Sequence, residues 1–367
     1  MMRQDSGLFF VCAVALSLLL CASAPAEDYA PLEDATKLEN PTICLERSAG
    51  LYLIDWDGQN RRLWMTGDFN GPAEWSLDGR YASFIANTPE FGLYTHYILE
   101  LETGLLINMT ERLNNKGFEH IDISGAWWFP NSRRLACRGN DRNSPLSRFS
   151  DIYALDFRDA TTLEQLTETP IEDEYWASVS ADGKIAFASD PPREEDIVLL
   201  ELVGPLPSHL YTMNANGTGV VNLTMSAASE SYPEWSPDGK KIAFMASGRP
   251  EQAGEAAGSD IFVMDPDGSN VERLTFRKDG LRARVSDWSA DSKWILFNME
   301  LDDNSPSELY RIHIETREIV RIAAGGSATW VLAGKSRFLS VDPAGKKHTQ
   351  WGEVKEAEAP QKENAAE

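Results

Sequence analysis

The sequence is poor in cysteine, and its one long apolar run lies at its start. Of four cysteines in 367 residues, Cys12 and Cys21 fall within the first 26 residues, and Cys44 and Cys137 lie in apolar, strand-like runs. Two cysteines in the rest of the chain exclude a disulfide scaffold and favour buried free thiols. No segment after residue 26 is apolar enough to span a bilayer, which takes about 20 residues.

Positive charge is also scarce. Lys and Arg number 34 against 57 Asp and Glu, which gives a formal net charge of −23. Nucleic-acid binders use clustered Lys and Arg to displace counterions from phosphates, so this balance argues against nucleic acid and against anionic lipid surfaces. The acidity predicts good solubility, with a cationic ligand or partner, or bound cations, as the sharper alternative.

Catalytic motifs are missing as well. A serine peptidase of the α/β-hydrolase type needs the elbow G-x-S-x-G, which does not occur, and no chain is left over for a catalytic domain. The five histidines show no pairing at a metal-ligand spacing. We therefore predict no catalytic residues.

The start of the chain has the layout of a secretory signal. Residues 8–20 are apolar or small, and Ala24-Pro25-Ala26 supplies a small-residue cleavage site. The run is too short for a membrane anchor. Lipidation of Cys21 is disfavoured because the bulky Leu20 stands where a small residue usually precedes the modified cysteine. We predict a signal peptide over 1–26, and hence export, followed by a linker over 27–42.

A short unit recurs along the rest of the chain. "PEWSPDGKKIAFMAS" (233–247) has relatives at 72–86, 126–140, 177–190, 286–300 and 328–342. Each copy carries one anchor residue just before its turn, and successive anchors are 42 to 56 residues apart. The anchors are Trp75, Trp128, Val179, Trp235, Trp288 and Trp330.

Turn chemistry explains the middle of the unit. Pro237 fixes φ, Asp238 accepts hydrogen bonds from its own backbone, and Gly239 allows a positive φ, which together close an antiparallel hairpin. The same turn is expected at Asp78-Gly79 and at Asp182-Gly183. A second strand pair follows each unit, as in "DIFVMDPDGSNVERLT" (260–275). Period-2 alternation makes these strands two-faced, so each period predicts a four-stranded sheet.

Four-stranded sheets with two partly apolar faces must pack against one another. Repeats of this length predict an all-β fold, a β-propeller over residues 43–354, with the anchor tryptophans between the blades. Six blades follow if the two chain ends complete one blade together, and seven if each end forms its own; we favour six. The acidic tail 355–367 lacks aromatics and is expected to be disordered.

Three carboxylates recur in this pattern. Glu74, Glu234 and Asp287 each immediately precede an anchor tryptophan. If the innermost strands converge on the axis, these carboxylates repel and raise one another's pKa unless something neutralises them. One interpretation is a binding site for a cation or a cationic peptide. The other, which we favour, is that each carboxylate caps the backbone locally or pairs with a Lys or Arg of a neighbouring blade.

A second candidate lies in "GFEHIDISGAWW" (117–128), directly before an anchor strand. His120 and Asp122, together with Glu119, could hold a divalent cation at the mouth of the channel. The alternative is a solvated loop histidine. The identity of any metal is unknown, and no cofactor is otherwise expected.

The repeat "YPEWSPDGKKIAFMAS", followed by "DIFVMDPDGSNVERLT", resembles the propeller repeat of the TolB family, the periplasmic component of the Tol–Pal envelope system. The resemblance implies a periplasmic, six-bladed, non-enzymatic scaffold. TolB also carries an N-terminal α/β domain, for which residues 27–42 leave no room, so the partners of that domain are not carried over. Related repeats occur in propellers of serine peptidases and polysaccharide lyases.

Together these features predict an exported, TolB-like, non-enzymatic scaffold that is monomeric and binds an envelope protein or peptide. The alternative is a carbohydrate-active enzyme, similar to a polysaccharide lyase, with a metal site at the channel mouth.

Overall fold

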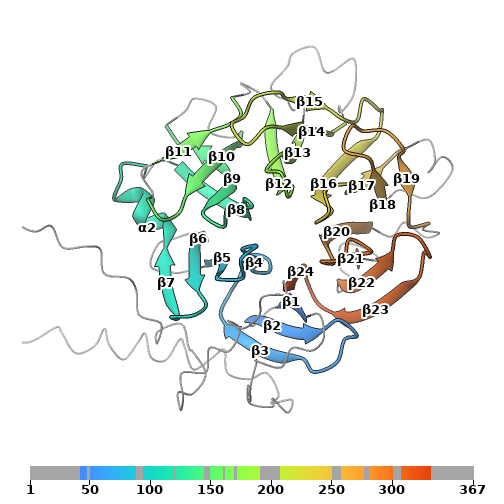
Figure 1. Ribbon diagram of the computed structural model, residues 1–367, viewed down its shortest axis with the longest axis horizontal. Coiled ribbons are helices and arrows are strands. Elements are labelled where there is room, and N and C mark those ends of the chain that lie inside the picture. Colours follow the sequence, from blue (N-terminus) through green and yellow to red (C-terminus); the bar gives the residue numbers. More distant parts are fainter. Residues whose placement is uncertain are drawn as a thin grey trace, which may run out of the picture. The chain divides into compact units, whose positions relative to one another are not determined.

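The computed structural model describes residues 42–47, 50–87, 94–118, 121–143, 149–159, 162–168, 172–190, 207–249, 258–276, 282–300 and 307–331. They form six four-stranded antiparallel sheets arranged as blades around a centre (Figure 1). The prediction of a six-bladed propeller is confirmed, and the seven-bladed alternative is wrong. The signal peptide, most of the linker, the tail and residues 332–354 lie outside the described residues.

Five blades are built from four consecutive strands each, numbered here from the inner strand outward. Blade 1 has β4 (Glu74–Trp75), β5 (Tyr81–Asn87), β6 (Tyr94–Glu100) and β7 (Leu105–Asn108); blade 2 has β8 (Ile121–Trp128), β9 (Arg134–Asp141), β10 (Asp151–Asp156) and β11 (Leu163–Gln165); blade 3 has β12 (Asp173–Val179), β13 (Ile185–Asp190), β14 (His209–Met213) and β15 (Val221–Asn222); blade 4 has β16 (Ser229–Trp235), β17 (Ile242–Ser247), β18 (Asp260–Met264) and β19 (Glu272–Arg273); and blade 5 has β20 (Arg282–Trp288), β21 (Trp294–Glu300), β22 (Glu308–His313) and β23 (Ile319–Ala324).

The sixth blade, called the closing blade here, is assembled from both ends of the described chain. Its inner strand is β24 (Ala328–Val331), and its outer strands are β1 (Thr42–Arg47), β2 (Gly50–Asp55) and β3 (Arg62–Thr66). β24 pairs with β1 antiparallel, and Trp330 lies opposite Ile43. The ring therefore closes by pairing between the first and the last described strands, which is why the two incomplete repeats count as one blade.

The inner hairpins close as the turn chemistry predicts, with one addition. The Asp238 carboxylate accepts a hydrogen bond from Lys240 N at 3.1 Å, and Gly239 has φ +69°. The Ser236 hydroxyl donates to Asp238 at 2.7 Å and accepts from Lys241 N at 2.9 Å. Serine thus bonds both sides of the turn, and it recurs at the same place as Ser76, Ser180 and Ser289.

The outer part of most blades is fixed by a recurring threonine. The Thr224 hydroxyl accepts a hydrogen bond from Leu210 N at 2.9 Å, and Thr275 accepts one from Ile261 N at 3.0 Å. In blade 1 the equivalent threonine, Thr110, lies in the short helix α2 (Met109–Asn114), which the sequence pattern did not predict. The Asn108 side chain caps this helix by accepting from Glu111 N at 2.9 Å.

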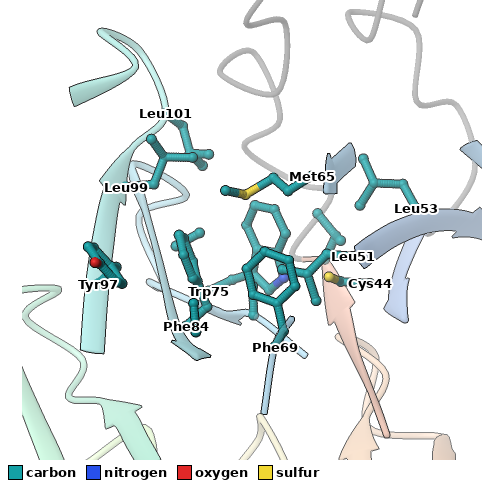
Figure 2. Packing of buried hydrophobic residues seen from close by; sticks show 14 of the residues in the cluster. Cys44, Leu51, Leu53, Met65, Phe69, Trp75, Phe84, Tyr97, Leu99 and Leu101 are labelled. Atoms are coloured by element: carbon teal, nitrogen blue, oxygen red, sulfur yellow. The ribbon is translucent and has the colours of Figure 1, made fainter. Parts of the chain in front are cut away.

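The core lies between blades rather than within them. Six hydrophobic clusters are found, one for each junction of neighbouring blades, and five of them contain a buried anchor tryptophan. Figure 2 shows Trp75 and Phe84 of blade 1 with Leu51 of the closing blade in one of these clusters. Such tryptophans contribute several kcal/mol of burial energy each. Val179 takes the anchor position at the junction of blades 2 and 3 and is only partly buried.

Two further observations bear on the sequence predictions. Cys44 and Cys137 are buried free thiols, as expected. Among the described helices, none combines the length and the apolar character that crossing a membrane would require.

Candidate functional site

The inner strands of all six blades surround the centre of the ring (Figure 1). The residue just before each anchor occupies an equivalent place on these strands. Going round the ring, these residues are Glu74, Trp127, Ser178, Glu234, Asp287 and Thr329. Only three of these six residues have an ionisable side chain, so the side chain at this position makes different contacts in different blades.

Three members of this set, Ser178, Thr329 and Asp287, bond to the inner part of the next blade, and the two hydroxyl residues do so in the same way. The Ser178 hydroxyl accepts from Trp235 N at 3.1 Å, and the Thr329 hydroxyl donates to the Ala73 carbonyl at 2.7 Å. Each bond joins the inner strands of neighbouring blades. Because the inner strands have no fifth strand to pair with, such side chains satisfy backbone groups that face the centre.

Asp287 makes the corresponding contact at the closure of the ring. Its carboxylate accepts from Trp330 N of the closing blade at 2.6 Å and from its own neighbour, Trp288 N, also at 2.6 Å. A single carboxylate thus links blade 5 to β24. The sequence analysis favoured capping or pairing with Lys or Arg of a neighbouring blade, whereas the donors to Asp287 are backbone N–H groups.

Glu74 and Glu234 behave differently. Their main-chain carbonyls accept hydrogen bonds from the indoles of the next anchors: Trp128 Nε1 bonds Glu74 O at 3.2 Å, and Trp288 Nε1 bonds Glu234 O at 2.9 Å. These bonds hold both backbones in place. Their carboxylates have neither a hydrogen bond nor an ion pair within the described part of the chain, and both residues retain partial exposure.

The three carboxylates, called the axial carboxylates below, are close enough to influence one another. Burial, together with the charge of Asp287, raises the pKa of Glu74 to about 8. Burial, followed by the charges of Asp287 and Glu74, raises the pKa of Glu234 well above its usual range. Burial also raises the pKa of Asp287 to about 7, against the lowering effect of its two backbone donors. The structure therefore brings together the three residues that the sequence pattern singled out.

Of the second predicted site, only Asp122 lies among the described residues. His120 and Glu119 lie outside the described residues. Asp122 is exposed near the start of β8 and forms an ion pair with Arg142 at 3.4 Å. Among the residues the structure describes, no three His, Cys, Asp or Glu side chains are placed to hold a metal ion together. The divalent cation thus remains an untested prediction.

A pair of aromatic residues on two inner strands was not predicted. Trp176 on β12 and Tyr232 on β16 each lie three residues before their anchor, and their rings stack with centroids 3.6 Å apart at 23°. Both residues have left-handed backbones, with φ +46° and +54°. For large side chains this conformation costs about 1–3 kcal/mol each. Both lie at bulges, where the pairing register of β12 and β16 shifts.

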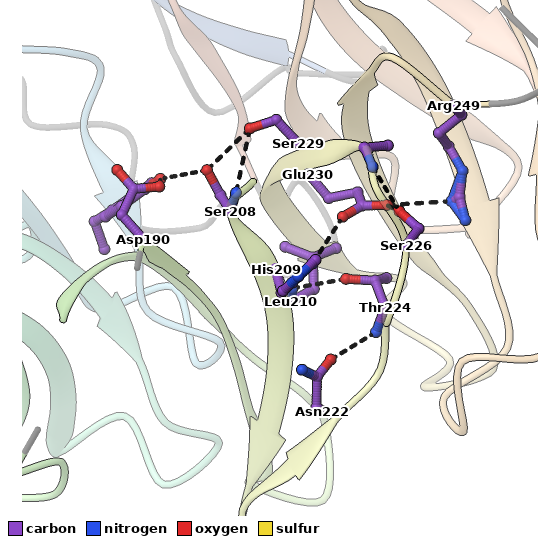
Figure 3. Close-up of polar contacts among 12 residues, drawn as sticks. Asp190, Ser208, His209, Leu210, Asn222, Thr224, Ser226, Ser229, Glu230 and Arg249 are labelled. Carbon is purple, nitrogen blue, oxygen red and sulfur yellow. Dashed lines mark hydrogen bonds and ion pairs between the residues drawn. The ribbon is translucent and has the colours of Figure 1, made fainter. Parts of the chain in front are cut away.

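A buried polar network lies nearby, at the junction of blades 3 and 4 (Figure 3). The fully buried Glu230 accepts from the Ser226 hydroxyl at 2.6 Å, contacts His209 Nδ1 at 3.4 Å and forms an ion pair with Arg249 at 3.5 Å. Burial raises the pKa of Glu230, against the opposing effects of Ser226, Arg249 and His209. This network joins blades 3 and 4 through buried polar contacts, so we interpret it as a structural link between them.

The residues that the sequence analysis missed share a detectable signal. Ser178 and Thr329 occupy the position before an anchor, and Trp176 and Tyr232 the position three before it. Reading down those two columns of the aligned repeats would have selected them without any structure.

By sequence, the chain matches no family model and no curated protein. By structure it is similar to TolB from Acinetobacter baumannii, with a TM-score of 0.57 and 16% identity over 79% of this chain and 66% of that one. A putative TolB from Agrobacterium tumefaciens gives a TM-score of 0.49 and 22% identity over 65% of this chain and 80% of that one. The oligogalacturonate lyase from Vibrio parahaemolyticus gives a TM-score of 0.48 and 13% identity over 77% of this chain and 79% of that one.

At 16% identity, the comparison with the Acinetobacter protein supports the fold and does not establish the activity. The chain covers 66% of the length of the Acinetobacter protein. The resemblance of the repeats to TolB is consistent with these comparisons, and the chain is a six-bladed β-propeller structurally similar to TolB.

Proposed function

We propose that this propeller is an exported, non-enzymatic scaffold that binds an envelope protein through a cationic segment received at the axial carboxylates. The single observation that carries the proposal is that the Glu74 and Glu234 carboxylates lie among protein groups on inner strands without a hydrogen bond or ion pair from the described residues. A partly buried carboxylate without a partner is unfavourable unless it is protonated or meets a positive group.

A partner's Lys or Arg would relieve this situation. Such a cation offsets the mutual repulsion of the carboxylates, and the net charge of −23 draws a basic partner from a distance. The remaining axial carboxylate, Asp287, is engaged by two backbone donors, so the free capacity lies with Glu74 and Glu234.

The location and the partner class rest on other features. Residues 1–26 have the layout of a secretory signal, which supports export. The likeness of the fold to TolB supports a periplasmic binding scaffold. The alternative, a metal-dependent carbohydrate enzyme, would use His120, which lies outside the described residues, and Asp122, which pairs with Arg142.

The experiment compares capture of partners by matched charge variants. Purified mature protein is cross-linked in envelope extract, using wild type, a Glu74→Gln/Glu234→Gln double variant, and a control double variant, Glu102→Gln/Glu168→Gln, that removes two exposed carboxylates elsewhere. We expect one protein to be captured by wild type and by the control, and captured far less by the axial variant. Capture should also weaken with added salt.

Two results would overturn the proposal. One is equal capture by the axial variant and the control, which would mean that the axial carboxylates do not bind the partner. The other is turnover of oligosaccharides or peptides by the purified protein at rates well above buffer, which would make the protein an enzyme.

A further inference from the structure

The stacked pair of Trp176 and Tyr232 is the least expected feature of the inner strands. Equivalent positions in the other four blades hold Pro72, Gly125, Val285 and Ser327, so no other inner strand carries an aromatic residue there. Trp176 keeps 37% of its surface exposed, although tryptophan in a propeller of this kind is mostly buried between blades. Exposure of a large ring on an inner strand needs an explanation other than core packing.

The backbone at both residues adds a second, independent observation. A left-handed φ is unfavourable for Trp and Tyr, and glycine, the residue suited to it, occurs at the same position of β8 as Gly125, with φ +67°. In blades 3 and 4 the same conformation is kept with two of the bulkiest side chains. Strain of this kind accumulates where a protein positions groups for binding.

The neighbours hold the pair rigidly. Tyr175 contacts the Trp176 ring edge-to-face, with centroids 4.4 Å apart, and Tyr232 stacks on its face. The Ser178 hydroxyl bonds Trp235 N, which ties the two strands together close to the rings. The indole is therefore fixed before any ligand arrives, as a stacking surface requires.

The charges nearby select the ligand. Glu234, one of the two unpartnered axial carboxylates, lies two residues after Tyr232 on β16. The charges that act on Tyr232 are those of Arg284 and Glu300, which pair with each other at 3.6 Å. An aromatic face with a carboxylate on the same strand suits a guanidinium group, which stacks on indole through its plane and donates hydrogen bonds from its edge. A lysine ammonium has the charge but no plane, and a neutral sugar or amide can stack and donate hydrogen bonds to the carboxylate but cannot offset its charge.

We propose that Trp176 and Tyr232 form a stacking platform for an arginine side chain of the bound partner, with Glu234 as its counter-charge. This inference rests on the proposed function and goes further by naming the residue type that the partner presents. Arginine rather than lysine is specified because the planar guanidinium can lie flat on a ring while its edge donates to a carboxylate, which a lysine ammonium cannot do.

The test uses small probes and the indole resonances of the full-length mature protein. Wild type is titrated with acetyl-Gly-Arg-Gly-amide, with the same peptide carrying citrulline, a neutral isostere of arginine, and with the lysine peptide. We expect the arginine peptide to shift the Trp176 indole signal and to bind at least about fivefold more tightly than the other two. Trp176→Leu should weaken arginine binding about five- to thirtyfold, whereas Phe276→Leu, which removes an exposed ring on another segment, should not.

Each possible result supports or overturns the platform. Equal binding of the citrulline peptide would overturn the proposal, because the charge of arginine would then play no part. A Trp176 shift produced by a neutral disaccharide and not by arginine would overturn it in favour of a carbohydrate platform. An arginine response that survives Trp176→Leu would place the site elsewhere. If that variant does not fold, the Trp176 shifts of wild type with the arginine and citrulline peptides are sufficient to test the proposal. Partner capture that persists in Trp176→Leu, with loss in the axial variant, would refute the platform and leave the proposed function standing.

Discussion

Replacing His96 with leucine should stabilise the protein, although it removes a polar residue from a β-strand. His96 lies on β6 with 1% exposure, and neither ring nitrogen has a hydrogen-bond partner among the described residues. Its backbone N–H bonds Thr110, as Leu210 bonds Thr224 and Ile261 bonds Thr275. The imidazole therefore occupies a place that other blades fill with an aliphatic side chain.

The magnitude follows from two effects. At pH 7 the neutral ring leaves its polar atoms unsatisfied, and removing such a group is worth about 1–3 kcal/mol. Burial also lowers the pKa of His96 from 6.5 to about 4. Between these values the unfolded chain takes up a proton that the folded protein refuses, so wild-type stability falls as the pH drops. The loss reaches about 3 kcal/mol once the pH is below 4, at about 1.4 kcal/mol per pKa unit.

Urea unfolding followed by tryptophan fluorescence at several pH values measures both effects. His96→Leu should be more stable than wild type at pH 7, and the difference should grow as the pH falls from 6.5 toward 4. The matched control is Leu210→His, which places an imidazole in the equivalent buried site of blade 3 and should create the same acid sensitivity. A His96→Leu difference that is negative, or that stays constant with pH, would refute the reasoning.

Further predictions concern the anchors, the closure, the turns and the axial carboxylates. Trp288→Ala should cost about 3–5 kcal/mol in urea unfolding, since this side chain is 2% exposed between blades; a loss below about 1 kcal/mol would contradict its anchoring role. Asp287→Ala should cost about 1–3 kcal/mol by leaving two backbone donors unpaired, and Asp287→Asn should recover part of it; equal losses would contradict this. Gly239→Ala should cost about 1–2 kcal/mol from its φ of +69° alone, because nothing lies within 4 Å of the added Cβ; an unchanged urea midpoint would argue against it. Glu74→Gln/Glu234→Gln should match wild type near pH 4.5 and exceed it near pH 9, because a raised folded pKa makes stability fall as pH rises; identical pH profiles would show that burial does not perturb these groups.

The fold could be predicted because its determinants are local and repeated. Pro237, Asp238 and Gly239 specify a hairpin by their own chemistry, and repetition of the pattern specifies the propeller. Six blades rather than seven depended on the two incomplete repeats pairing into one blade, which the sequence analysis favoured and the pairing of β24 with β1 confirms. The helix α2, which follows the outer strand β7 and buries Met109 and Leu113, was missed because it occurs in only one of the described blades and so leaves no repeated pattern.

The site could be predicted in part. Glu74, Glu234 and Asp287 were found because they recur beside the anchors, and the structure brings them together. What the sequence could not distinguish was their bonding state: Asp287 meets a backbone donor across the closure, and the two glutamates do not. That difference depends on where β24 lies in the folded protein, which the local sequence does not determine. Trp176 and Tyr232 were missed because the repeats were compared at the anchors and at the residue before them, and not three residues before them, where these two aromatic residues stand out.

The features that local rules fail to explain are concentrated on the inner strands. Glu74 and Glu234 keep carboxylates without partners among the described residues, and Trp176 and Tyr232 adopt a backbone suited to glycine. Each of these residues lowers the stability of the fold. Other blades have Ser178, Thr329 or Gly125 at the equivalent positions, which shows that residues without this penalty fit there. A fold that only had to close its ring could use those residues throughout. The set includes the neighbouring strands β12 and β16, which carry the stacked rings of Trp176 and Tyr232 and, on β16, the carboxylate of Glu234. This combination on two adjacent inner strands is the strongest reason to place ligand binding there.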